Sequence, residues 1–125
     1  MKYFLLLIMT TVIVWANSVE KEEKGGKNFT LAMNYLIGYE VKEDNKKAFK
    51  FFHKAARQGS VEAKYFMGTC FDQGIGVKKQ QELARYWYRQ AAKGGYSKAV
   101  YKLAEVERSL HIGGVYKTSY LSYLK

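Results

Sequence analysis

The chain has 125 residues, of which 48% are hydrophobic and 16% aromatic, so it can form one small packed domain and is not a disordered tail. Its 21 lysines and arginines outnumber 11 acidic residues, and the net charge of +10 favours acidic proteins, anionic lipid or nucleic acid as partners. The single cysteine, Cys70, excludes an intrachain disulfide, so the stability must come from packing.

Residues 1–16 are typical of a signal peptide. Lys2 supplies a positive charge, an apolar stretch follows, and Val14 and Ala16 are small residues at the two positions that a signal peptidase reads. We expect cleavage near Ala16 and export to a periplasm or to the outside of the cell. An uncleaved N-terminal membrane anchor is the alternative, although the apolar run is shorter than the ~20 residues of a membrane span.

The first regular segment follows a charged stretch. Residues 17–27 contain two glycines and no apolar period, which predicts a flexible lead-in. From Asn28 the apolar residues fall at helical spacing, and Gly38 closes this helix. Asp44 is suited to cap a second helix, which ends at Gly59. Residues 28–59 are therefore expected to form one helix-turn-helix unit.

A second cycle occupies residues 60–95 and a third begins at residue 96. Ser60 and Ser97 are expected to cap the first helix of each, and the second cycle continues with a helix over residues 79–93. The third cycle, residues 96–125, slips by two residues and is too short to be complete. We expect it to cap the array, with four apolar residues covering the last face: Tyr116, Tyr120, Leu121 and Leu124.

The chain matches itself at an offset of 36 residues. Seven positions of the first unit, Val41, Ala48, Phe51, Phe52, Ala55, Ala56 and Gly59, correspond to Val77, Ala84, Trp87, Tyr88, Ala91, Ala92 and Gly95. These residue types are the ones that packing constrains, so the match describes a repeated structural unit and not a repeated active site. No period-2 alternation is sustained, which predicts an all-α fold.

This pattern resembles the Sel1-like repeat family, a relative of the tetratricopeptide repeats. The residues expected to be structural are Gly38, Ala48, Gly59, Gly68, Gly74, Gly76, Ala84, Trp87, Tyr88 and Gly95. Ala32 and Glu40 depart from the family's glycines, and Gln80 stands where the family prefers aspartate, which predicts a weaker cap. The resemblance implies a short right-handed α-solenoid of antiparallel helix pairs, with two full repeats and a truncated capping repeat, used mainly as an adaptor.

Candidate catalytic and metal-binding residues do not converge. His53 and His111 have no cysteine or carboxylate at ligand spacing, and the turn Gly74–Val77 lacks the strand and third glycine of a phosphate-binding loop. Cys70 lies in an apolar stretch that favours a core residue over a nucleophile. We therefore expect no enzyme activity, cofactor or metal. The remaining enzymatic alternative is β-lactam binding or weak hydrolysis, which is linked to some exported members of the resembled family.

The first helices are expected to line the concave side of the solenoid, where partners of such proteins usually bind. Seven positions not needed for the core are candidate partner-binding residues: Thr30, Met33, Ile37, Phe66, Thr69, Gln73 and Lys102. Among them, Met33, Ile37 and Phe66 are apolar and form a predicted recognition patch. The alternative is that these three side chains pack against neighbouring helices.

Basic residues recur at three-to-four spacing on the second helices: Lys46, Lys47, Lys50, Lys54, Arg57, Arg85, Arg89 and Lys93. They form either a solvated outer face or a contact for anionic lipid headgroups or an acidic protein; nucleic acid is not expected for an exported chain. The sequence thus favours a non-catalytic exported adaptor or regulator that binds a protein with an acidic or mixed surface in the cell envelope. A periplasmic immunity or inhibitor protein that covers a toxic enzyme is the alternative.

Overall fold

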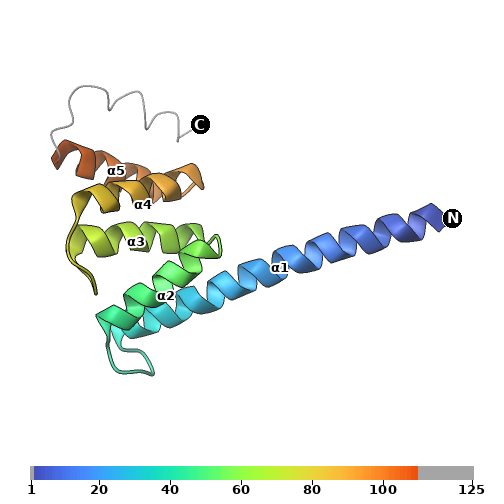
Figure 1. The fold of residues 1–125 in the computed structure, drawn as a ribbon, viewed down its shortest axis with the longest axis horizontal. Coiled ribbons are helices and arrows are strands. Elements are labelled where there is room, and N and C mark those ends of the chain that lie inside the picture. Colours follow the sequence, from blue (N-terminus) through green and yellow to red (C-terminus); the bar gives the residue numbers. More distant parts are fainter. Residues whose placement is uncertain (1, 110–125) are drawn as a thin grey trace.

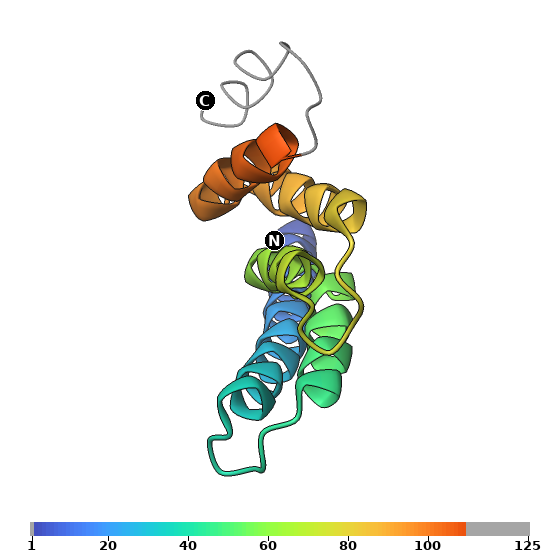
Figure 2. The same ribbon diagram turned by 90° about the vertical axis from the view of Figure 1, so that its left-hand side faces the viewer.

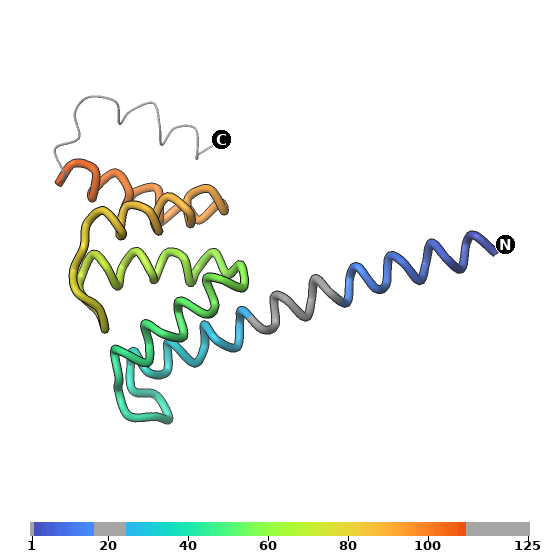
Figure 3. The backbone as a smooth tube through the Cα atoms, in the orientation of Figure 1, coloured from blue at the N-terminus to red at the C-terminus, as the bar shows by residue number. Residues whose placement is uncertain are grey.

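A computed structural model describes residues 2–109, with side chains placed throughout that range except at residues 17–24. The described chain forms five helices and no strand (Figures 1 and 3): α1 Lys2–Ile37, α2 Asn45–Arg57, α3 Val61–Gln73, α4 Gln81–Lys93 and α5 Ser97–Ser109. The predicted all-α fold is therefore confirmed. The expected C-terminal cap and His111 lie outside the described residues.

The helices stack as antiparallel pairs, which is the α-solenoid arrangement. The helix α1 packs on α2, α3 packs on α4, and the α2–α3 and α4–α5 contacts join one pair to the next. Figure 2 shows α1, α3 and α5 on one side of the stack and α2 and α4 on the other. We call these sides the first-helix face and the second-helix face.

Side-chain caps set the helix starts. The Asp44 carboxylate accepts a hydrogen bond from the Lys47 N–H at 3.0 Å, and the Ser60 hydroxyl accepts one from the Ala63 N–H at 3.1 Å. Gln80 makes no side-chain cap, as its residue type predicts, and α4 begins at Gln81 and not at residue 79. The expectation that Ser97 caps α5 is wrong, because Ser97 is already helical and is the first residue of α5.

Small residues let the helices approach closely around two large buried side chains, Phe52 and Tyr88, which are both 0% exposed. A Cβ atom at Gly68 would lie 2.5 Å from the Tyr88 ring, so α3 and α4 can meet at this distance only with glycine there. Burying each ring stabilises the fold by about 2–3 kcal/mol.

The helix α1 is much longer than the sequence indicates. We expected a flexible lead-in over residues 17–27 and a helix start at Asn28, but the helical backbone is continuous from Lys2 to Ile37. Gly25 is buried where α1 passes the end of α2, and a Cβ atom there would lie at ordinary contact distance, 3.7 Å, from Gln58 and Ser60.

The N-terminal part of α1 extends away from the stack (Figure 1), and the side chains of residues 2–16 are exposed. Within the described range, no helix is both long enough and apolar enough to cross a membrane.

The turns inside the two helix pairs follow the same path with different residues. Gly38 and Gly74 have left-handed φ angles of 72° and 74°. Two residues later, Gly76 has φ 67°, whereas its counterpart Glu40 has φ 58°, which is strained for a residue with a side chain. A Cβ atom at Gly76 would lie 2.0 Å from the Asn45 carbonyl oxygen, so the second turn rests directly on the backbone of the preceding repeat.

Candidate functional site

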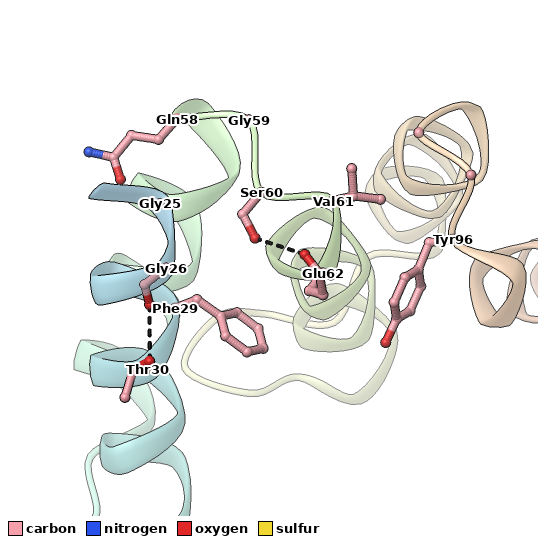
Figure 4. Close-up of a pocket in the computed structure, with 12 residues that line it drawn as sticks. Gly25, Gly26, Phe29, Thr30, Gln58, Gly59, Ser60, Val61, Glu62 and Tyr96 are labelled. Atoms are coloured by element: carbon pink, nitrogen blue, oxygen red, sulfur yellow. Dashed lines mark hydrogen bonds between the residues drawn. The ribbon is translucent and has the colours of Figure 1, made fainter. Parts of the chain in front are cut away.

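A cleft of about 780 Å³ opens where α1 passes the N-terminal ends of α3 and α5 (Figure 4). It is lined by residues from α1, from the two turns that join the helix pairs and from the first turn of α3: Gly25, Gly26, Phe29, Thr30, Gln58, Gly59, Ser60, Val61, Glu62, Gly94, Gly95 and Tyr96. The cleft therefore extends from α1 across the start of α3 to the turn that precedes α5, and one ligand in it would touch each of these segments.

The shape of the cleft depends on absent side chains. Five of its twelve lining residues are glycines. At Gly94 a Cβ atom would lie 2.8 Å from the Val61 side chain, so the α4–α5 turn can approach α3 only with glycine there. Gly59 and Gly95 end their helix pairs with φ angles of 100° and 88°, which residues with side chains rarely adopt. The glycines of the turns that end each repeat thus have two effects: they permit the turn, and they leave the cleft free of side chains.

Aromatic rings form the apolar side of the cleft and continue beneath it. The Phe29 ring lies 5.5 Å from Phe66, the Phe66 ring 5.5 Å from Tyr65, and the Tyr65 ring 5.0 Å from Tyr96. In Figure 4, Phe29 and Tyr96 lie on opposite sides of the first turn of α3. Rings with both an apolar body and a hydroxyl suit the binding of peptide side chains.

The same position of each first helix carries an aromatic residue: Phe29, Tyr65 and, another 36 residues on, Tyr101. Phe29 and Tyr65 are half-buried, whereas Tyr101 on α5 is 70% exposed. The first-helix face therefore carries one aromatic row across all three helices, and the last ring of the row, that of Tyr101, is exposed.

Polar groups at the cleft are held by bonds to their neighbours. The Asn28 amide donates to the Gln58 side-chain oxygen at 2.8 Å and ties α1 to the α2–α3 turn. The Ser60 hydroxyl donates to Glu62 at 3.4 Å, and Thr30 donates to the Gly26 carbonyl at 3.0 Å. Glu62 is the one lining residue that is charged at neutral pH, and it is exposed. The cleft can thus offer hydrogen bonds and apolar contact.

The structure disperses the seven candidate partner-binding residues. Thr30 lines the cleft. Ile37 and Gln73 are exposed at the C-terminal ends of α1 and α3, which are the ends away from the cleft. Met33 and Phe66 pack against the core, and the Phe66 ring stacks on Phe52 at 5.0 Å, which favours the packing alternative for these two.

The last two candidates are engaged in local interactions. The Thr69 hydroxyl accepts a hydrogen bond from Tyr88 at 3.3 Å. The Lys102 ammonium donates to Glu105 at 2.8 Å, and this bond raises the pKa of Lys102 and lowers the pKa of Glu105. Both side chains remain only partly buried.

Sequence reasoning missed Tyr96 and the glycines of the cleft. The sequence pattern places Gly25 and Gly26 in the lead-in, and it indicates only a helix stop at Gly94 and Gly95. A signal for Tyr96 was present, because the equivalent position in the preceding repeat is the cap Ser60. A ring that replaces a capping hydroxyl is not explained by helix formation, and here it forms one wall of the cleft.

The described residues hold no arrangement suited to catalysis or metal binding. Cys70 is 1% exposed, and burial raises the pKa of its thiol to about 12, so the thiol stays protonated at neutral pH. Between Lys2 and Ser109 no three His, Cys, Asp or Glu side chains gather in a way that could hold a metal ion. His53 lies against Trp87, with ring centroids 6.2 Å apart.

Comparison with known proteins gives a consistent answer. The Sel1 repeat model matches residues 28–60 and 61–96. Chitin synthase regulatory factor 3 of Schizosaccharomyces pombe is 35% identical over 95 residues, 74% of this chain and 10% of that protein. Chitin synthase regulatory factor 4 of the same yeast is 28% identical over 110 residues, 87% of this chain and 17% of that protein. The chain thus spans less than a fifth of either relative.

A solved structure agrees in fold. The crystal structure of a Sel1 repeat protein from Oxalobacter formigenes superposes with a TM-score of 0.71 and 26% sequence identity, covering 81% of this chain and 42% of that one. The repeat spacing, the stacked helix pairs and the match of the family model to both units lead to one conclusion: the chain belongs to the Sel1 repeat family.

Proposed function

We propose that this protein is a non-catalytic adaptor or regulator that binds a segment of another protein in the cleft of the first-helix face. The observation that carries the proposal is the cleft along α1, the start of α3 and the turn before α5, together with an aromatic residue at the same position of all three first helices. An extended polypeptide could contact all of them at once, whereas a small substrate would meet no group suited to chemistry there. The two yeast relatives are named as regulatory factors, which supports the same role.

The proposed setting is the cell envelope, after export and cleavage near Ala16. The exposed apolar side chains of residues 3–9 and 12–15 support this setting, because they do not pack against the core of the repeats. The net charge of +10 supports a partner with an acidic or mixed surface, and contact with anionic lipid headgroups is the alternative role of the basic residues. The intact mass of the protein from its native host tests the setting, because cleavage would leave Asn17 as the first residue.

Site-specific photo-crosslinking tests the role of the cleft. A photoreactive residue at Thr30 or Tyr101 reports on the first-helix face, and one at Lys79, in the loop before α4, is the matched exposed control. We expect one and the same protein to be crosslinked from Thr30 and from Tyr101, but not from Lys79. The variant Thr30→Arg, which places a long side chain in the cleft, should abolish the crosslink from Tyr101 while the thermal stability is unchanged. Equal crosslinking from all three positions would refute a specific site.

A further inference from the structure

The positive charge of the second-helix face is concentrated on α2. Lys46, Lys50 and Arg57 are exposed and lie on one side of this helix, because their spacing of four and seven residues matches the helical period. In the part of the chain that the structure describes, none of the three forms an ion pair. The three charges therefore stay available over about 17 Å of helix, at 1.5 Å per residue.

The repeat itself does not require this charge. The positions of α4 equivalent to Lys46 and Lys50 carry Glu82 and Tyr86, whereas Arg57 corresponds to the exposed Lys93. Two other basic residues of α4 are paired, since Arg85 lies 2.7 Å from Glu82 and Arg89 lies 3.1 Å from Glu107. Helix packing is thus satisfied with or without lysine at the first two positions, and Lys46 and Lys50 are a property of α2 alone.

Beside the basic side of α2, the helix α4 presents apolar groups. Tyr86 is 51% and Leu83 is 38% exposed, and the Trp87 ring packs against Tyr86 with centroids 5.4 Å apart. The contact between Trp87 and His53 of α2, at 6.2 Å, places the two helices next to each other at this point. We call the combined surface of Lys46, Lys50, Arg57, Leu83, Tyr86 and Trp87 the α2–α4 face.

We propose that the α2–α4 face is a second docking surface, which binds an acidic segment of a partner protein that carries an aromatic or aliphatic side chain. The carboxylates of the segment pair with Lys46, Lys50 and Arg57, and its apolar side chain packs on Tyr86 and Leu83. Unpaired charge and exposed rings on adjacent helices supply the two kinds of complementarity that specific recognition needs.

The distribution of acidic residues favours a narrow segment over a flat anionic membrane. The exposed carboxylates of Glu40 and Glu43 stand just before α2, and Glu82 stands at the start of α4. A bilayer surface would meet these carboxylates together with the lysines and be repelled by them. The helix α2 itself contains no acidic residue, so a segment that runs along it from Lys46 to Arg57 passes basic side chains.

Binding of synthetic peptides to the full chain, measured by fluorescence anisotropy, tests the proposal. The probe is a peptide of about 12 residues, long enough to span the basic side of α2, with glutamates, one tryptophan and two leucines. One control peptide replaces the tryptophan and leucines by alanine, and another replaces the glutamates by lysine. Vesicles of phosphatidylserine and phosphatidylcholine are tested in parallel.

We expect only the peptide with both glutamates and apolar residues to bind well. Lys50→Glu should weaken its binding by about tenfold and Tyr86→Ser by about fivefold, whereas Lys98→Glu, the same charge change at an exposed site of α5, should leave it within about twofold. Equal losses for Lys50→Glu and Lys98→Glu, equal binding of the alanine peptide, or binding to vesicles without binding to the peptide would overturn the proposal. Thr30→Arg should not affect this binding, so the two surfaces can fail independently.

Discussion

The two complete repeats bury the same interhelical contact with different chemistry. In the second repeat the Tyr88 hydroxyl lies 3.3 Å from the Thr69 oxygen and 3.4 Å from an Asp72 carboxylate oxygen. In the first repeat Phe52 takes the place of the tyrosine, and the partners become Met33 and Leu36. The polar ring occurs only together with its polar partners, because a buried hydroxyl without one is costly.

The close approaches that rely on glycine differ in the same way. Gly76 of the second turn touches the Asn45 backbone of the first repeat, whereas the equivalent Glu40 is exposed. Likewise, Gly68 lies under the Tyr88 ring, whereas the equivalent residue of the first repeat is the buried Ala32. The second repeat thus requires glycine at positions 68 and 76, where a ring or a backbone lies against it. The first repeat has Ala32 and Glu40 at the equivalent positions.

Gly76→Ala should have the largest effect of the changes that test this contrast. The new Cβ atom would lie 2.0 Å from the Asn45 carbonyl oxygen, and alanine would also be strained at φ 67°. We expect a loss of about 3–5 kcal/mol in the free energy of unfolding, measured by urea denaturation. Glu40→Ala is the matched control and should change the stability by less than about 0.5 kcal/mol. Equal losses at both sites would show that the two turns do not differ.

Gly68→Ala should destabilise the fold by about 2–3 kcal/mol, because a Cβ atom there would lie 2.5 Å from the Tyr88 ring. The reverse change in the first repeat, Ala32→Gly, should cost only about 1 kcal/mol, mainly through helix propensity. In the background of Tyr88→Leu the cost of Gly68→Ala should fall by half or more. A double-mutant cycle by chemical denaturation measures this coupling, and additive losses would contradict it.

Exchanging the two rings separates the hydroxyl from the ring. Phe52→Tyr would bring a hydroxyl to the position where Met33 and Leu36 replace its partners, and we expect a loss of about 2 kcal/mol. Tyr88→Phe removes two long hydrogen bonds and should cost about 1 kcal/mol. Thermal unfolding followed by circular dichroism ranks the two variants. A smaller loss for Phe52→Tyr than for Tyr88→Phe would refute the matched chemistry of the repeats.

Alkaline pH should destabilise the second repeat selectively, because it holds Cys70 where the first has Asn34. Burial raises the pKa of the thiol from 9.0 to about 12, so the unfolded chain releases its proton first and stability falls as pH rises above about 9. The loss from Cys70 alone is about 1 kcal/mol at pH 10. Cys70→Ala should make the decline of stability between about pH 8 and pH 10 shallower. An unchanged slope would show that the thiol does not titrate on unfolding.

Glu40→Gly should have the smallest effect and the opposite sign. Glycine tolerates the φ angle of 58°, so removal of the strain should raise the stability by about 0.5–1 kcal/mol, less the entropy that glycine adds to the unfolded chain. Differential scanning calorimetry would detect this as a small increase in the melting temperature. A decrease would indicate that the glutamate side chain makes a stabilising contribution that outweighs the strain.

The sequence predicted the repeated helices well, because each is bounded by local chemistry that the chain displays. Asp44 and Ser60 cap α2 and α3, and Gly59 and Gly74 follow their ends. The long α1 could not be predicted, since nothing local distinguishes Gly25 in a loop from Gly25 in a helix that passes a neighbouring turn. The candidate site was predicted only at Thr30, because the cleft is formed by turns from different repeats whose proximity depends on the stacking.

The backbone contact at Gly76 also gives the stack a polarity. The second unit contacts the first through Gly76 of its turn, which lies against the backbone of Asn45 at the start of α2. The first unit offers the Cβ atom of Glu40 at this point, and an identical unit placed ahead of it would have its backbone against that carbon. A contact of the same geometry on that side would therefore place a backbone against a side chain and not against a glycine.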